Sequence, residues 1–143
     1  MTKSRPTEKA VSGSATPHPF DATGLSISLT VDDLGASLTW YRDVLGFAVE
    51  RDFERGGVPF AVRMRAGSVA LLLTQDNGAR GSQRLKGEGL SIRFTTAQNI
   101  DDLAARARAS GAVLDSEPAD VWGMRAFRLR DPDGFRLVIS SEP

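Results

Sequence analysis

Residues 25–31 read Leu-Ser-Ile-Ser-Leu-Thr-Val, and residues 32–46 read Asp-Asp-Leu-Gly-Ala-Ser-Leu-Thr-Trp-Tyr-Arg-Asp-Val-Leu-Gly. The first stretch alternates strictly between apolar and small polar side chains, which predicts a strand with one buried and one polar face. In the second stretch apolar residues return every three or four positions behind two aspartates that can cap a helix. Gly46 suits the left-handed residue that ends a helix. A strand followed by an amphipathic helix from about Leu34 is therefore predicted.

Three more strands are predicted directly after this helix. They cover residues 47–53, 58–66 and 69–74, with Gly56-Gly57 as the turn between the first two. Residues 75–88 are polar, rich in glycine and mixed in charge, so they predict a long loop of a kind that is commonly functional. The first half of the chain thus reads β-α-β-β-β.

The same order of elements returns in the second half. Asp101-Asp102-Leu103 opens a helix that closes at Gly111, 69 residues after the first Asp-Asp-Leu triplet. An Asp-Pro-Asp-Gly turn at 131–134 precedes the last strand. The predicted strands are 90–95, one starting at 112–114, 122–130 and 135–140. The pattern predicts an α+β fold of two β-α-β-β-β modules, an internal repeat; two independent hairpin-rich modules are the alternative.

Each predicted sheet has one face that its own helix cannot cover. Ile27, Leu29 and Val31 would pack on the first helix, as would Leu90, Ile92 and Phe94 on the second. The opposite faces carry small polar side chains. Two curved sheets that face each other would enclose a cleft lined by those side chains; a face simply wetted by solvent is the alternative.

The domain organisation is simple. Residues 1–22 are rich in Ser, Thr, Pro and Lys and predict a flexible tail, in which His18 is interpreted as a solvated linker residue. Residues 23–143 predict a single domain. Within it, module 1 spans about 25–75, a loop spans 76–88 and module 2 spans about 89–141.

Composition excludes several classes of function. The 143 residues contain 18 basic and 18 acidic side chains, which argues against a nucleic-acid binder. There is no Cys and only one His, so a disulfide framework, a thiolate nucleophile and a multi-histidine metal site within one chain are excluded. No stretch approaches the length of about 20 apolar residues that a membrane span needs. No membrane contact is expected, and the expected location is cytoplasmic.

Several motifs resemble one known family. The residues that carry the resemblance are 27–34, 37–47 with Trp-Tyr-Arg-Asp-Val-Leu-Gly-Phe at their end, Trp122-Gly123 and the turn at 131–134. In these stretches the sequence resembles the vicinal oxygen chelate superfamily. This superfamily holds glyoxalase I, extradiol dioxygenases, fosfomycin resistance enzymes and bleomycin resistance proteins. The resemblance covers about residues 25–141. It implies a curved, half-open mixed sheet around a cleft, and a homodimer.

The resemblance also implies where a metal ion would be bound in metal-dependent relatives. Four inward strand positions carry His, Glu or Gln there, and they match Ser26, Leu72, Gly89 (or Leu90) and Val138 of this chain. Leu, Gly and Val side chains supply no donor atom and Ser is a poor neutral ligand. Metal-dependent glyoxalase, dioxygenase or transferase activity is therefore disfavoured, and no metal or other cofactor is expected.

Arginine is the most prominent candidate ligand-binding residue. Arg63, Arg93 and Arg128 alternate with apolar neighbours and so would point toward the cleft. Guanidinium groups bind carboxylate or phosphate and stack on aromatic rings. We therefore expect a small organic, partly apolar and anionic ligand. The candidate ligand-binding residues are Ser26, Ser28, Arg63, Arg93, Trp122 and Arg128. The alternative is that the arginines form strand-face ion pairs with Asp52, Glu54 and Asp120.

The sequence shows no pair of a nucleophile and a base. Trp40 and Tyr41 are interpreted as packing residues, and nothing singles out Asp76 or Glu88 of the loop as an acid or base. The leading hypothesis is a metal-free protein that binds a small molecule, similar to the bleomycin-resistance branch and suited to sequestering a drug or metabolite. An enzyme of the same superfamily, a lyase, isomerase or dioxygenase, is the alternative. A non-catalytic accessory subunit is a third possibility.

Overall fold

The computed structural model describes residues 19–81 and 85–143, so the prediction for His18 lies outside the described residues. Residues 19–26 have no regular secondary structure and are exposed, and Ser26 and Leu25 precede the first strand. The elements, in chain order, are β1 (Ile27–Val31), α1 (Leu34–Val44), β2 (Ala48–Arg55), β3 (Val58–Ala66), β4 (Val69–Gln75), β5 (Ser91–Thr96), α2 (Ile100–Ala109), β6 (Leu114–Val121), β7 (Met124–Arg130) and β8 (Arg136–Ser141).

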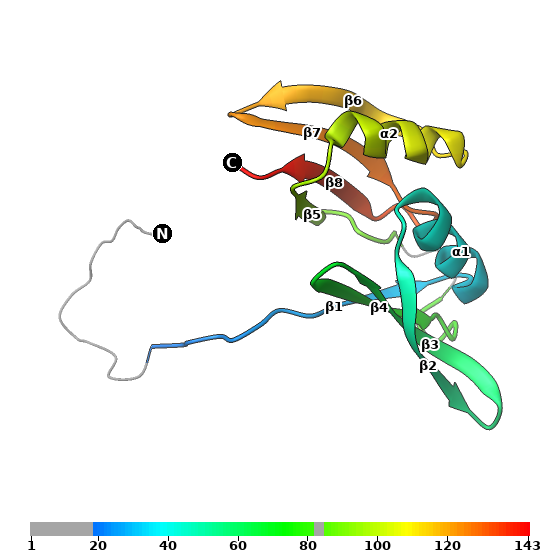
Figure 1. Cartoon of the computed structure of the whole chain (residues 1–143). Helices are drawn as coiled ribbons and strands as arrows, with labels where there is room; N and C mark the ends of the chain where they lie inside the picture. Colours follow the sequence, from blue (N-terminus) through cyan, green and yellow to red (C-terminus); the bar gives the residue numbers. More distant parts are fainter. Residues whose placement is uncertain (1–18, 82–84) are drawn as a thin grey trace.

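These elements form two modules of identical topology (Figure 1). Sheet 1 has the strand order β1-β4-β3-β2 and sheet 2 the order β5-β8-β7-β6. In each sheet the first and last strands of the module pair in parallel, and the remaining pairs are antiparallel. The predicted α+β fold with an internal repeat is confirmed, as two separate open sheets.

The residues that cap the two helices occupy equivalent places in the two modules. Asp33 caps α1, accepting a hydrogen bond from the Ala36 amide at 3.0 Å, as its position before the helix predicts. In α2 the cap is Asn99, which accepts from the Asp102 amide at 2.9 Å. The prediction that Asp101-Asp102 opens the second helix is confirmed, because both lie within its first turn, where their negative charge is favourable at the positive end of the helix dipole; the helix begins one residue earlier, at Ile100.

The hairpin turns are also equivalent in the two modules. Gly56-Gly57 joins β2 to β3, and Trp122-Gly123 joins β6 to β7; all four residues have positive φ. Two such residues make the tight turn whose twist matches a β-hairpin. The prediction that the strand begins at Trp122 was therefore wrong by two residues. Leu90, predicted to be a core residue, also lies outside its strand and is 49% exposed.

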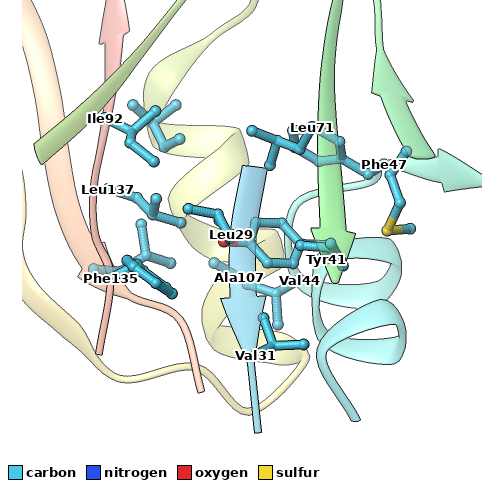
Figure 2. Close-up of a cluster of buried hydrophobic side chains, with 14 of the residues drawn as sticks. Leu29, Val31, Tyr41, Val44, Phe47, Leu71, Ile92, Ala107, Phe135 and Leu137 are labelled. Carbon is cyan, nitrogen blue, oxygen red and sulfur yellow. The ribbon is translucent and has the colours of Figure 1, made fainter. Parts of the chain in front are cut away.

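One hydrophobic core joins both modules. Figure 2 shows Leu29 of β1 in the same cluster as Ile92 and Leu137 of sheet 2. The rings of Phe47 and Phe94 meet edge to face across the modules, with centroids 5.6 Å apart. The helix-covered face of each sheet is thus buried in a core shared with the other module, and its opposite face lies away from that core.

A buried hydrogen bond also crosses the modules. The Tyr41 hydroxyl of α1 donates to Asp131 at 2.7 Å, and the other oxygen of this carboxylate accepts from the amides of Asp133 and Phe135 at 2.9 Å. Burial, reinforced by the negative charge of Asp131, raises the pKa of Tyr41, so the hydroxyl stays protonated and remains a donor. The prediction that Tyr41 is a packing residue is confirmed.

Lys86, in the loop between the two modules, contacts both of them. Its ammonium lies 2.7 Å from an Asp32 oxygen and 3.1 Å from an Asp76 oxygen in module 1, and 3.5 Å from Asp133 in module 2. The Lys86 side chain is only 6% exposed and that of Asp133 only 2%. Burial opposes the charge, but hydrogen bonds to Asp32 and Asp76 outweigh it and raise the pKa of Lys86. We call these four residues the Lys86 clasp.

Removing this ammonium should destabilise the fold strongly. In Lys86→Met the clasp carboxylates lose their shared partner, and breaking such a buried pair costs on the order of 3 kcal/mol. Urea denaturation measures the effect. Arg108→Met is the control, because its ion pair with Glu117 is exposed and contributes less than about 1 kcal/mol. Equal stability of the two variants would contradict this account of the clasp.

Candidate functional site

The faces of the sheets that lie away from the core carry equivalent rows of residues. Across sheet 1, Ser28, Leu72 and Arg63 are in register on β1, β4 and β3. Across sheet 2, Arg93, Val138 and Arg128 are in register on β5, β8 and β7. Neighbouring strands are about 4.8 Å apart, so about 10 Å separates the outer Cα atoms of each row. We call these rows the sheet 1 row and the sheet 2 row.

Both rows have an apolar residue at their centre and an arginine on its antiparallel side. Leu72 is half-buried and Val138 is only 2% exposed. Arg63 and Arg128 occupy the same place in the repeat, 65 residues apart. Sheet 2 adds Arg93 where sheet 1 has Ser28. Each row therefore has an apolar centre with an arginine beside it, and the Leu72 side chain is partly accessible whereas Val138 is covered within its own chain.

The row arginines form no ion pair with any carboxylate that the structure describes, although the charge of Arg63, after that of Arg65, helps to lower the pKa of Glu50. Within the described part of the chain, no carboxylate forms an ion pair with Arg63, Arg93 or Arg128. The alternative that they pair with Asp52, Glu54 and Asp120 is therefore wrong for these residues. Asp120 instead binds Arg125, at 3.1 Å.

Two neighbouring arginines behave differently. Arg65 binds Glu50 with oxygen distances of 2.8 and 3.2 Å, and Arg130 binds Asp115 at 2.9 Å. Hydrogen bonding to the guanidinium of Arg65 lowers the pKa of Glu50. Each of these paired arginines lies two residues beyond a row arginine on the same strand, and so on the same face. The repeat thus places one free and one paired arginine side by side in both modules.

The other two candidate residues lie apart from the rows. Ser26 is exposed and precedes β1. Trp122 lies in the β6–β7 turn and is 92% exposed. Met124, the first residue of β7, is already about 13 Å of extended strand away from Arg128. Within one chain, Trp122 therefore does not lie beside the arginines of the sheet 2 row.

Three further residues lie beside the sheet 1 row, and of these the sequence predicted the face only of Thr30. Thr30 and Thr74, whose hydroxyl oxygens lie 3.4 Å apart, line a hollow of about 450 Å³ together with Arg80 of the loop. Strand alternation places Thr30 on the same face of β1 as Ser28. It likewise places Thr74 on the same face of β4 as Leu72. No sequence signal marked Arg80, because its position depends on how the loop folds.

A second cavity, of about 590 Å³, lies where the modules meet. It is lined by the end of α1, the β3–β4 turn, the end of β5 and Arg106 of α2. None of the predicted site residues lines it, and none of the described hollows is lined by both rows. One chain thus leaves the sheet 1 row and the sheet 2 row in separate places.

The positions that hold a metal ion in metal-dependent relatives do not fit one here. Leu72 and Val138 are the apolar centres of the two rows, and their side chains have no donor atom. Ser26 and Gly89 lie outside the strands. In the part of the chain that the structure describes, no group of three or more His, Cys, Asp or Glu could hold a metal.

The family assignment agrees with this fold. Residues 24–139 match the Glyoxalase/Bleomycin resistance protein/Dioxygenase superfamily. The chain belongs to this superfamily. Superfamily membership covers the whole two-module fold and leaves the activity open, because one fold hosts many functions. Comparison with curated proteins gives no significant match. No helix in the described ranges 19–81 and 85–143 has the length and apolar character to cross a membrane.

Several solved structures share the architecture at low sequence identity. TioX from Micromonospora sp. ML1 is 18% identical with a TM-score of 0.67, covering 85% of this chain and 97% of its own. A glyoxalase/bleomycin resistance protein/dioxygenase from Nocardioides is 21% identical with a TM-score of 0.65, covering 86% and 85%. Lactoylglutathione lyase from Agrobacterium tumefaciens is 19% identical with a TM-score of 0.62, covering 84% and 94%. These likenesses show the fold alone.

The turn at Trp122 generates a prediction about stability. Trp122 has φ +53°, a region that is strained for a bulky side chain, where module 1 has Gly56. Trp122→Gly should raise the free energy of unfolding by about 1 kcal/mol, the relieved strain exceeding the entropy cost of glycine. Chemical denaturation measures the change.

The reciprocal control is Gly56→Ala. A Cβ at Gly56 meets no atom within 4 Å, so the expected loss of about 1 kcal/mol comes from the backbone alone. A Trp122→Gly protein less stable than the parent would contradict the prediction. It would show that the indole makes contacts that a single chain does not provide.

Proposed function

We propose that this chain binds a small organic anion, without a metal ion, in a cleft that two copies of the chain form between a sheet 1 row and a sheet 2 row. The observation that carries the proposal is the pair of rows: free arginines flank an apolar residue at the places where metal-dependent relatives hold their ligands. Sequestration of a drug or metabolite is the activity that this arrangement supports best.

The argument for a free guanidinium is electrostatic. An exposed arginine beside a carboxylate gains a weak surface ion pair, as Arg65 and Arg130 do. Arg63, Arg93 and Arg128 have no such partner, although acidic residues are present on neighbouring strands. A guanidinium fork matches a carboxylate or phosphate through two parallel hydrogen bonds. The unpaired arginines are thus available to an external anion.

The argument for a second copy rests on the placement of the rows. Each row lies on the face of its sheet away from the shared core, and none of the described hollows unites the two rows. A two-fold dimer would bring the sheet 1 row of one copy over the sheet 2 row of the other, twice, because a two-fold interface is reciprocal. A cleft between curved sheets then has an apolar floor and charged walls, as ligand sites commonly do.

The experiment has two parts. Light scattering on the full chain after size-exclusion chromatography should give twice the chain mass. A thermal-shift screen of metabolites and antibiotics, with EDTA and again with zinc, nickel, manganese or iron, should find a compound that raises the melting temperature equally in both conditions.

Two results would contradict the proposal. One is a stoichiometric divalent metal that the purified chain retains and that the ligand requires. The other is a monomer whose melting temperature no compound raises.

A further inference from the structure

The repeat also indicates how many charged groups the ligand carries and where they lie. Arg63 and Arg128 are equivalent by position: each lies on the third strand of its module, beside the central residue of its row, two residues before an arginine that is paired. The paired arginines bind acidic residues on the preceding strand that are themselves equivalent, Glu50 and Asp115. Each module therefore has one arginine without an ion pair and one paired arginine at equivalent positions.

We propose that the ligand carries an acidic group at each end of a short apolar body, one group for Arg63 of one copy and the other for Arg128 of its partner. This inference rests on the proposed cleft. A diacid would give each wall of the cleft an acidic partner, whereas a monoacid would leave the guanidinium groups of one wall without a partner when the second copy covers them. Desolvating an unpaired charge is unfavourable, which favours a ligand with two charges.

The centres of the rows define the body of the ligand. Leu72 and Val138 lie beside these arginines, one strand away on each sheet, and neither side chain can form a hydrogen bond. A short aliphatic chain can pack against Leu72, which is only half-buried, without leaving a polar group unsatisfied. A hydroxylated or amide-rich body would be desolvated there without compensation.

The two ends of the cleft differ. Arg93 and Arg128 flank Val138 with Cα atoms about 10 Å apart, so two long guanidinium side chains can reach one group between them. At the corresponding place sheet 1 has Ser28 opposite Arg63. The sheet 2 end therefore suits a doubly charged phosphate or phosphonate, and the sheet 1 end suits a carboxylate that accepts from one guanidinium and one hydroxyl.

The test is a calorimetric titration of the full chain with matched probes. The diacids are malonate, succinate, glutarate, adipate and 3-phosphonopropionate, and the matched neutral compound is glutaramide. We expect at least one diacid to bind, the phosphonate more tightly than the dicarboxylate of equal length, and glutaramide not to compete. Arg63→Gln and Arg128→Gln should each weaken the diacid by about tenfold or more, because each removes a charge-assisted hydrogen bond.

The control variants are Arg65→Gln and Arg130→Gln, on the same strands and faces but already paired. They should change the affinity by less than about threefold, since exposed ion pairs contribute little. Circular dichroism checks that all four variants fold.

The inference is overturned if no diacid binds more tightly than glutaramide, or if the controls weaken binding as much as Arg63→Gln and Arg128→Gln. If a neutral or cationic compound from the thermal-shift screen binds a metal-free dimer, the proposed cleft stands and only the diacid is wrong. A monomer without any ligand would remove the cleft itself.

Discussion

Leu29 and Val31 of β1 enter the same hydrophobic core as Ile92 and Leu137 of sheet 2, and the rest of the molecule depends on this shared burial. A four-stranded sheet with a single helix can cover only one of its faces. The two modules solve this by joining their helix-covered faces, with Tyr41 of α1 hydrogen bonded to Asp131 of the other module. The opposite faces are consequently left for solvent, for a ligand or for another copy of the chain.

Polar interactions at the module boundary make this arrangement specific. Hydrophobic contacts alone are not directional, whereas the Lys86 clasp requires the end of β1, the end of β4 and the β7–β8 turn to meet at one ammonium. Asp133 also accepts a hydrogen bond from the Asp32 amide at 2.8 Å. The turn between the last two strands thus orients module 2 against the first helix start of module 1.

The two modules share their form but differ in the chemistry of particular positions. The hairpins, the row positions and the paired arginines match between the modules. Two equivalent positions differ: module 1 has Ser28 where module 2 has Arg93, and Gly56 where module 2 has Trp122. Matched positions provide two similar walls, and the differing positions distinguish one end of a bound molecule from the other. The strained, exposed indole at the turn is the clearest departure from what folding alone favours.

Strand alternation and helix spacing are local, so the sequence by itself determined the two β-α-β-β-β modules, the buried faces and the outward direction of Arg63, Arg93 and Arg128. It found the second helix start to within one residue, at Asp101 where the helix begins at Ile100, and it extended a strand through Trp122 because an aromatic residue rarely occupies a left-handed turn. Only the tertiary structure decided that the modules join through their helix sides, that the row arginines lack acidic partners and that Thr74 and Arg80 lie together. The reason is that these properties depend on contacts between residues distant in sequence, which no local pattern encodes.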